Sequence, residues 1–362
     1  MRKTKVYIDV FYYGAALSGI KTYIEELVSG LYKYGSNDID YIFSHDIKSQ
    51  RKKRFFINSK YKFFRWIFQF LYFFWKQVIL PSKLFFNKAD ILICPDYIAP
   101  VLSPCRKIVV IHDNLFWKYP NDYPYLWRKY FITLIQLGLS RNAEIVTTSR
   151  YSKDGLKKIF NININYVYQS SDFMINNFND YNSKKYFLHI GTFERRKDLI
   201  TLVKAFKLFK VNIKSDYKLI LAGSKHINGN KKSYQEIKKY ILKNNLNSEV
   251  LTPGYINKKQ AISYYNNAYA YIFPSLDEGF GIPLVEAMKT QVPIICSDIK
   301  IFKEIGDDSV IYFKKNNYND LFNKLKLIFN NHDLIKNLKI KSSKRARLFN
   351  QKNFVQGFEK LY

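Results

Sequence analysis

Short apolar runs recur along the chain, and each is followed by a polar loop and a segment with helical spacing of apolar residues. In the first half, these runs lie at residues 5–10, 90–94, 107–111 and 144–148. In the second half, they lie at residues 186–190, 217–222, 270–273 and 292–296. Apolar runs of this length that alternate with helices are typical of buried parallel strands. The pattern therefore predicts an α/β protein with two Rossmann-like domains.

A polar stretch, residues 176–185, separates the two series of predicted strands and is the expected linker. We therefore expect an N-terminal domain over residues 1–175 and a C-terminal domain over residues 186–345. Ligands of parallel sheets bind beyond the carboxyl ends of the strands. A cleft between two facing domains is thus the expected active site.

One segment, residues 274–288, places two carboxylates around a glycine-rich turn that opens a helix. Gly279 and Gly281 permit close approach of a ligand, and Pro283 suits the start of a helix. The N–H groups and positive dipole end of such a helix favour an anion such as a diphosphate. Carboxylates beside that anion cannot bind phosphate, so we expect Glu278 and Glu286 to bind sugar hydroxyls.

Glu278 and Glu286, with seven residues between them, resemble the E-x7-E motif of the retaining GT-B glycosyltransferases of family 4. The resemblance implies that Glu278 binds the donor sugar and that Glu286 accepts hydrogen bonds from the ribose diol. It also implies a nucleotide-sugar contact at each residue of the intervening turn, namely Gly279, Phe280, Gly281 and Ile282.

Other segments carry the same resemblance. Arg196 and Lys197, after Gly191-Thr-Phe-Glu194, resemble the diphosphate-binding pair of the family, whereas Arg195 is assigned no role. Arg supplies a rigid fork of donors for phosphate oxygens, and Lys supplies a point charge. Tyr255 and Ile256, in the segment 252–256, resemble the loop that lines the nucleotide base.

In the first domain, Gly19 lies in a turn that resembles the phosphate loop of the family, although Ser18 replaces the first glycine of its usual pair. His112, followed by Asp113, resembles the histidine that contacts the donor sugar. Ser149 resembles the start of a family helix and is also a suitable helix N-cap.

The resemblance further implies the GT-B fold, with an acceptor-binding domain over residues 1–175, a nucleotide-sugar-binding domain over residues 186–345, and a C-terminal helical segment, residues 346–362, that returns to the first domain. The implied activity is that of a hexosyltransferase acting with retention of anomeric configuration, without a cofactor or an obligatory metal. GDP-mannose is the favoured donor, from the His112-Asp113 and Gly191–Glu194 segments, with TDP- or UDP-sugars next. The expected acceptor is a saccharide or a lipid-linked oligosaccharide in bacterial polysaccharide or O-antigen synthesis.

The composition of the chain indicates its expected partners and its expected location in the cell. The net charge is +30, which favours anionic partners such as phosphate-bearing substrates or anionic lipid. Three cysteines, Cys94, Cys105 and Cys296, lie far apart and suggest neither a disulfide framework nor a zinc site. Residues 1–10 lack the apolar core of a signal peptide, so we expect a cytoplasmic protein.

The segment 51–88 is unusual because it contains no acidic residue. The basic residues 51–54 precede an aromatic-rich stretch, residues 63–80, that is too polar and too short for a membrane span of roughly 20 residues. An in-plane helix on the inner face of the plasma membrane is expected, with its cations at anionic lipid. Alternatively, these aromatic residues form the core of the first domain.

Two other functions remain as alternatives. Asp38-Ile-Asp40 offers the D-x-D of a metal-dependent GT-A transferase, but a single-domain GT-A enzyme leaves one predicted domain unexplained. The basic-aromatic segment could instead belong to a membrane- or nucleic-acid-binding protein without transferase activity. No nucleic-acid-binding signature accompanies it, so we expect no nucleic-acid partner.

Overall fold

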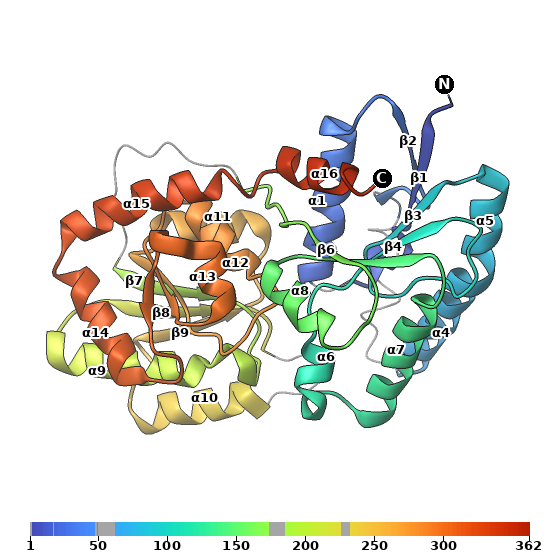
Figure 1. The fold of residues 1–362 in the computed structure, drawn as a ribbon. Helices are drawn as coiled ribbons and strands as arrows, with labels where there is room; N and C mark the ends of the chain where they lie inside the picture. Colours follow the sequence, from blue (N-terminus) through green and yellow to red (C-terminus); the bar gives the residue numbers. More distant parts are fainter. Residues whose placement is uncertain (1, 17, 48, 50–61, 174–184, 226–231) are drawn as a thin grey trace. The chain divides into compact units, whose positions relative to one another are not determined.

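A computed structural model describes residues 2–16, 18–47, 49, 62–173, 185–225 and 232–362 (Figure 1). The chain divides into two compact units: residues 1–172 with 350–362, and residues 173–349. The expected linker, residues 176–185, lies outside the described residues except for Lys185. The basic residues 51–54 also lie outside them.

The first unit contains a six-stranded sheet in the order β2-β1-β3-β4-β5-β6, and all of its strand pairs are parallel. Its strands are β1 Thr4–Ile8, β2 Ile39–Phe43, β3 Ile91–Cys94, β4 Arg106–Val110, β5 Ala143–Thr147 and β6 Ile164–Tyr166. Its helices are η1 Phe11–Gly14, α1 Ser18–Tyr34, α4 Lys62–Phe74, η2 Trp75–Ile79, α5 Leu80–Asn87, α6 Leu115–Lys118, η3 Pro120–Asp122, α7 Tyr125–Gly138, α8 Arg150–Lys157 and α16 Gln351–Glu359.

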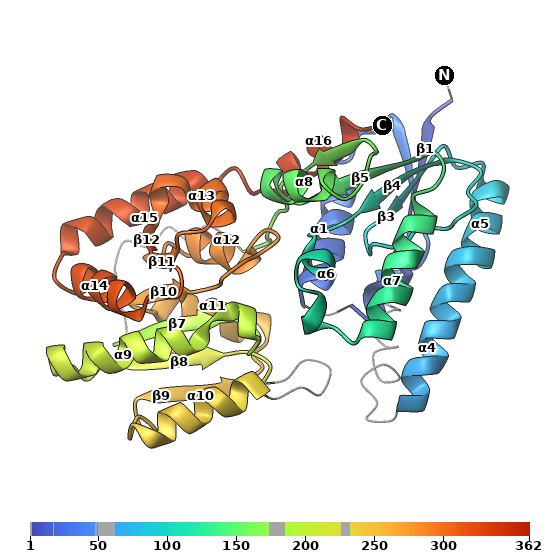
Figure 2. The same cartoon turned by 60° about the horizontal axis from the view of Figure 1, so that its bottom comes forward.

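Two hydrophobic layers cover this sheet, because successive strand residues point to opposite faces. Val6 and Ile8 of β1 join a cluster with α1 and α16, whereas Tyr7 joins a cluster with α4, α5 and α7. The final helix, α16, therefore packs against α1 within the first unit, as the sequence predicted. Figure 2 shows α4, α5 and α7 on one side of the sheet.

The second unit contains a second parallel six-stranded sheet, in the order β12-β11-β10-β7-β8-β9. Its strands are β7 Tyr186–Ile190, β8 Lys218–Ala222, β9 Val250–Gly254, β10 Ala270–Phe273, β11 Ile294–Ser297 and β12 Ile311–Phe313. Its helices are η4 Arg195–Lys197, α9 Leu199–Ile213, α10 Lys232–Lys243, α11 Lys258–Asn267, α12 Ile282–Lys289, α13 Lys300–Gly306, η5 Asp307–Ser309, α14 Tyr318–Phe329 and α15 His332–Ala346.

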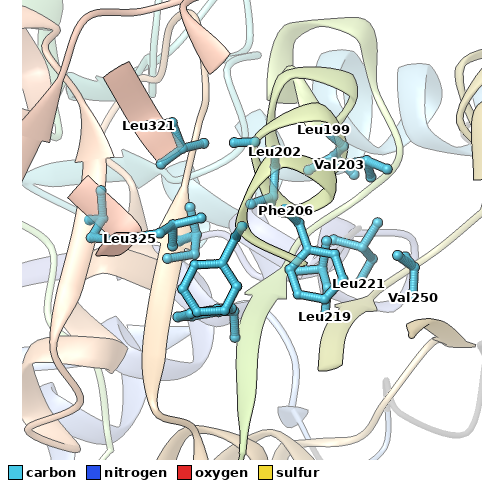
Figure 3. Close-up of a cluster of buried hydrophobic side chains, with 14 of the residues drawn as sticks. Leu199, Leu202, Val203, Phe206, Leu219, Leu221, Val250, Leu321 and Leu325 are labelled. Atoms are coloured by element: carbon cyan, nitrogen blue, oxygen red, sulfur yellow. The ribbon is translucent and has the colours of Figure 1, made fainter. Parts of the chain in front are cut away.

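The core of this unit lies between its sheet and the helices α9 and α14. Phe206 of α9 is fully buried among Leu219 and Leu221 of β8, and Leu321 of α14 closes the same cluster (Figure 3). The strand order reverses between β7 and β10, which are direct neighbours. Such a switch point leaves a crevice at the carboxyl ends of the two strands, where ligands of these folds bind.

All eight strands predicted from the apolar runs are confirmed, with ends shifted by at most two residues. Four further strands, β2, β6, β9 and β12, were not predicted, and they are the edge strands of the two sheets. The segment expected to line the nucleotide base therefore begins as a strand, since Thr252–Gly254 belongs to β9.

The aromatic segment combines both expectations on opposite faces of α4, η2 and α5. Tyr72 and Trp75 are buried in the core, whereas Phe70 and Phe74 are exposed. Lys76, which lies in the same acid-free segment, is not one of its surface cations. Its Nζ is fully buried, 2.8 Å from Asp9 Oδ2 and 2.7 Å from Asp96 Oδ1, because these two carboxylates require a cation inside the domain.

Candidate functional site

Two loops meet at the switch point of the second unit. One follows β7 and contains Arg196 and Lys197; the other follows β10 and contains Glu278. The N–H of Leu276 donates a hydrogen bond of 2.8 Å to the carbonyl oxygen of Arg196, which joins the loops directly. Residues 81 positions apart are thus brought to one point by the sheet topology.

Glu278 accepts contacts from both cations of the predicted pair. Arg196 Nη1 lies 2.8 Å from Glu278 Oε2, and Lys197 Nζ lies 2.5 Å from Oε1. The hydroxyl of Ser275 also donates to Oε1, at 2.7 Å. Glu278 and Lys197 are both buried, so this cluster is an internal ion network rather than a surface pair.

Arg196 is held in place by two further acceptors. Its Nη1 donates to the carbonyl oxygen of Asp277 at 2.6 Å, and its Nη2 contacts Glu194 Oε2 at 3.1 Å. Arg195, in contrast, is exposed to solvent, as expected for a residue without an assigned role. The guanidinium of Arg196 is thereby fixed before any ligand binds, which lowers the entropic cost of anion recognition.

The electrostatics of the cluster keep Glu278 ionised. Burial opposes ionisation, but the charges of Arg196 and Lys197 outweigh it and lower the pKa of Glu278 to about 2. The ammonium of Lys197 also lies 5.3 Å from the centre of the Phe273 ring, a cation–π contact from the strand below the site. Glu278 is therefore ionised at neutral pH and pairs with both cations.

Helix α12 begins at this site. Gly281, its N-cap residue, has φ +88°, a left-handed conformation that disfavours any side chain, and a Cβ there would lie 3.1 Å from Phe302 Cε1. Gly279 does not have a positive φ, so its backbone conformation does not require glycine at this position. Ile282 and Pro283 begin the first turn; Pro283 has no N–H group, and the N–H of Leu284 donates to the carbonyl oxygen of Gly281 at 2.8 Å.

Glu286 lies one turn into α12 and accepts a hydrogen bond of 3.2 Å from the hydroxyl of Tyr265, on α11. Sequence reasoning missed this tyrosine and also missed Ser275, because neither stands in a motif of the family resemblance. Tyr255 follows β9 and is exposed, and Ile256 beside it is half-buried. The structure thus brings together Arg196, Lys197 and Glu278 and places Glu286 on the adjoining helix.

The two site residues predicted in the first unit lie near one helix. Gly19 lies in the first turn of α1, and apart from its chain neighbours and its own helix backbone, no atom of the described residues lies within 4 Å of the position that a Cβ would take. Tyr23, one turn later, packs edge-on against His112, with ring centres 4.6 Å apart. Helix α1 therefore links the phosphate-loop residue to the histidine that follows β4.

His112 is held as a neutral imidazole. Its Nε2 lies 2.9 Å from the carbonyl oxygen of Pro95, which can only accept, so Nε2 carries the proton and Nδ1 is an acceptor. Burial lowers the pKa of His112 to about 4, although its hydrogen bond acts in the opposite direction. A neutral side chain suits a contact with sugar hydroxyls.

Two alternatives for other residues are resolved by the structure. Ser149 acts as the N-cap of α8, since its Oγ accepts the N–H of Ser152 at 3.0 Å. Asp38 precedes β2 and Asp40 lies near its start, both exposed at the amino end of an edge strand. That position is remote from the carboxyl ends where ligands bind, so a D-x-D metal site is not supported. Within the described residues, no group of three His, Cys, Asp or Glu side chains could hold a metal ion.

Residues 170–346 match the family described as Glycosyl transferases group 1. The chain is 26% identical over 250 residues to the O-antigen chain mannosyltransferase RfbU of Salmonella typhimurium, covering 67% of this chain and 65% of that protein. It is 27% identical over 170 residues to a Campylobacter jejuni N-acetylgalactosamine-N,N'-diacetylbacillosaminyl-diphospho-undecaprenol 4-alpha-N-acetylgalactosaminyltransferase, covering 46% of this chain and 43% of that protein.

Among solved structures, Alr3699/HepE of Anabaena, crystallised with UDP and glucose, superposes with a TM-score of 0.72 at 13% identity and covers 99% of both chains. Residues 170–346 thus form a domain of the group 1 glycosyltransferases, and the two α/β units of the chain have the GT-B fold. Both the family and the fold class predicted from the sequence are confirmed. The matches to RfbU and to the Campylobacter transferase each span less than two thirds of the relative's length. No helix in the described ranges combines the length and the apolar character needed to cross a bilayer.

Proposed function

We propose that this protein is a retaining hexosyltransferase that moves a sugar, with mannose from GDP-mannose as the favoured donor, to a lipid-linked saccharide. It would act in bacterial polysaccharide or O-antigen synthesis, in the cytoplasm, at the inner face of the plasma membrane. The observation that carries this proposal is the buried cluster of Arg196, Lys197 and Glu278 at the switch point of the second unit.

In the proposed complex, the donor diphosphate binds Arg196, Lys197 and the first turn of α12. Phosphate oxygens then compete with Glu278 for the two cations, and the released carboxylate becomes an acceptor for sugar hydroxyls. The same exchange explains why a carboxylate stands beside an anion site. Without a ligand it neutralises the cations, and with a ligand it orients the sugar.

The proposed reaction breaks the bond between the anomeric carbon and the phosphate oxygen and forms one from the acceptor hydroxyl on the same face. The acceptor proton moves to the departing phosphate oxygen, whose negative charge is stabilised by Arg196 and Lys197. Fixed donors at a developing oxyanion are worth about 3 to 4 kcal/mol each in comparable sites. We further propose that Glu286 accepts hydrogen bonds from the ribose diol. The backbone at Gly19 would contact the donor phosphates, and His112 would contact the donor sugar. No metal is required.

The identity of the donor rests on relatives. The name of RfbU describes a mannosyltransferase of O-antigen chains, which supports mannose, whereas the HepE structure contains UDP and glucose, which keeps UDP-sugars in contention. The name of the Campylobacter relative describes an acceptor on diphospho-undecaprenol, which supports a lipid-linked acceptor here. Tyr255 and Ile256, after β9, are the proposed contacts of the base and would discriminate among nucleotides.

The proposal is tested by incubating the purified chain with radiolabelled GDP-mannose, UDP-glucose or a TDP-hexose and with membranes of the source organism. We expect one donor to label the lipid-extractable fraction well above the other two, with release of its nucleoside diphosphate. If no donor is consumed while the folded chain binds RNA in a salt-sensitive manner, the non-enzymatic alternative is correct instead.

A further inference from the structure

The helical segment formed by α4, η2 and α5 has a second apolar face that points away from the core. Tyr72, Trp75 and Lys76 are buried, whereas Phe70, Phe74 and Val78, spaced by four residues, form a strip on the solvent side. Phe70 is 68% exposed. A strip of this kind on a helix that already has a buried face is not needed for the fold of the domain.

Helix α7 repeats this arrangement. Its residues Leu134, Ile135 and Gly138 are buried, and Leu126, Tyr130 and Leu137 form an apolar strip on its solvent side. Leu126 is 78% exposed and is one of the most exposed large apolar residues among those described. No motif in the sequence assigns a role to this strip.

Both strips lie on the same side of the same sheet. The buried faces of α4, α5 and α7 join one hydrophobic cluster, so their exposed faces both point away from that sheet. The loop at Val101 connects the helices: its N–H donates to Gln77 Oε1 at 3.0 Å, and Lys107 Nζ contacts both the Val101 and the Gly138 carbonyl oxygens. In both views, α7 lies beside α4 and α5 (Figures 1 and 2).

The charge of this surface selects its partner. Neither the segment 62–87 nor α7 contains an acidic residue, and Lys83 and Lys129 are exposed cations on these helices. Two copies of the chain that met through this face would bring like charges together, which disfavours a dimer. Aliphatic side chains such as Leu126 and Val78 have no role in stacking on nucleic-acid bases. Apolar strips flanked by cations fit an anionic bilayer surface.

We propose that α7 and the α4–α5 segment together form one docking face for an anionic lipid bilayer. This inference rests on the proposed function, since it extends membrane attachment from one helix to two. Two helices anchored on one sheet fix the orientation of the domain on the membrane, which a single in-plane helix does not. The aromatic and aliphatic side chains enter the headgroup boundary, and Lys83 and Lys129 meet the lipid phosphates.

The test is co-sedimentation of the full chain with vesicles of phosphatidylglycerol and phosphatidylcholine, without substrates. We expect the double variant Leu126→Asp, Tyr130→Asp to bind at least tenfold more weakly, which corresponds to about 1.4 kcal/mol. The matched control is Leu242→Asp, Ile340→Asp, on exposed apolar residues of the second unit (53% and 64% exposed), and it should bind as the wild type does. Lys83→Gln, Lys129→Gln should weaken binding to these vesicles and leave binding to pure phosphatidylcholine unchanged.

Several results would overturn the proposal. If the α7 variant binds vesicles as the wild type does, while Phe70→Asp, Phe74→Asp abolishes binding, α7 is not part of the docking face. If light scattering shows a wild-type dimer that dissociates in the α7 variant, the face binds a second copy. Thermal unfolding of each variant verifies the fold. An inactive chain that still binds vesicles through α7 would contradict the proposed transferase function alone.

Discussion

Lys197 forms a buried ion pair with Glu278, Nζ to Oε1 2.5 Å, at the carboxyl ends of β7 and β10. In the proposed complex, a diphosphate competes with Glu278 for the same ammonium. The first two predictions distinguish the role of the carboxylate from the role of the cations.

Glu278→Gln keeps the shape of the side chain but removes the charge that would orient the sugar. We expect transfer to fall at least tenfold, which corresponds to about 1.4 kcal/mol of barrier. Affinity for the nucleoside diphosphate alone should rise, because the cations lose their internal partner. The control is Glu236→Gln on the exposed surface of α10. Wild-type turnover in Glu278→Gln would contradict the assigned role.

Arg196→Ala and Lys197→Ala should each weaken binding of the nucleoside diphosphate, since each removes one cation from the site. Arg195→Ala is the matched control: the residue adjoins the pair in sequence but is exposed, and its replacement should change little. Calorimetry with the free nucleotide measures all three. Equal affinities would show that the diphosphate binds elsewhere.

Two histidines, the half-buried His112 and the buried His189, predict a loss of stability in acid. Burial lowers the pKa of His112 and of His189 from 6.5 to about 4. Between these values the unfolded chain binds more protons than the folded chain, so the free energy of unfolding falls as the pH drops through this window. Above pH 6.5 neither residue contributes. Titration of the imidazole resonances by NMR, with His112→Asn for assignment, tests this; a His112 midpoint near its unperturbed value would contradict it.

Lys76→Met should strongly destabilise the first unit. The change leaves Asp9 and Asp96 buried without their shared cation, and breaking a buried ion pair in this way costs about 3 to 5 kcal/mol. Lys83→Met, an exposed site on the same segment, should change stability by less than about 0.5 kcal/mol. Urea unfolding measures both. Adding Asp96→Asn to Lys76→Met should recover part of the loss, whereas no recovery would mean that packing rather than charge dominates.

Chelation of divalent metals should leave transfer largely intact. In the proposed mechanism Arg196, Lys197 and a helix start stabilise the departing diphosphate, and no metal-ligating cluster is found among the described residues. Activity is compared with and without EDTA. Complete loss that manganese restores would return the metal-dependent mechanism to consideration.

The limits of prediction from the sequence follow the exposure of each element. Central strands such as β10, residues Ala270–Phe273, are buried on both sides, and their apolar runs are recognisable. Among the edge strands, β2 is interrupted by Asp40 and β9 by Pro253, and β6 and β12 have only three residues each, so no apolar run of ordinary strand length marks them. Strand prediction by apolar runs therefore finds the centre of a sheet and misses its rim.

The site was partly predictable for a related reason. Arg196, Lys197 and Glu278 stand in recognisable segments, but the ion network among them depends on the contact between β7 and β10, which the sequence does not encode locally. The burial of Lys76 was missed in the same way. Its partners, Asp9 and Asp96, each follow a buried strand, and their position after β1 and β3 was the available signal.

The buried ammonium of Lys76 has a practical consequence. Enzymes that attach to membranes are often made freely soluble by deleting the attaching segment. Here the segment also supplies Trp75, whose Nε1 donates to Asp9 Oδ1 at 3.0 Å, together with the only counter-charge within reach of Asp9 and Asp96 among the described contacts. Excision of α4 and α5 would therefore remove part of the domain's interior. A variant that lacks the proposed membrane attachment is therefore better made by replacing the outward side chains one by one.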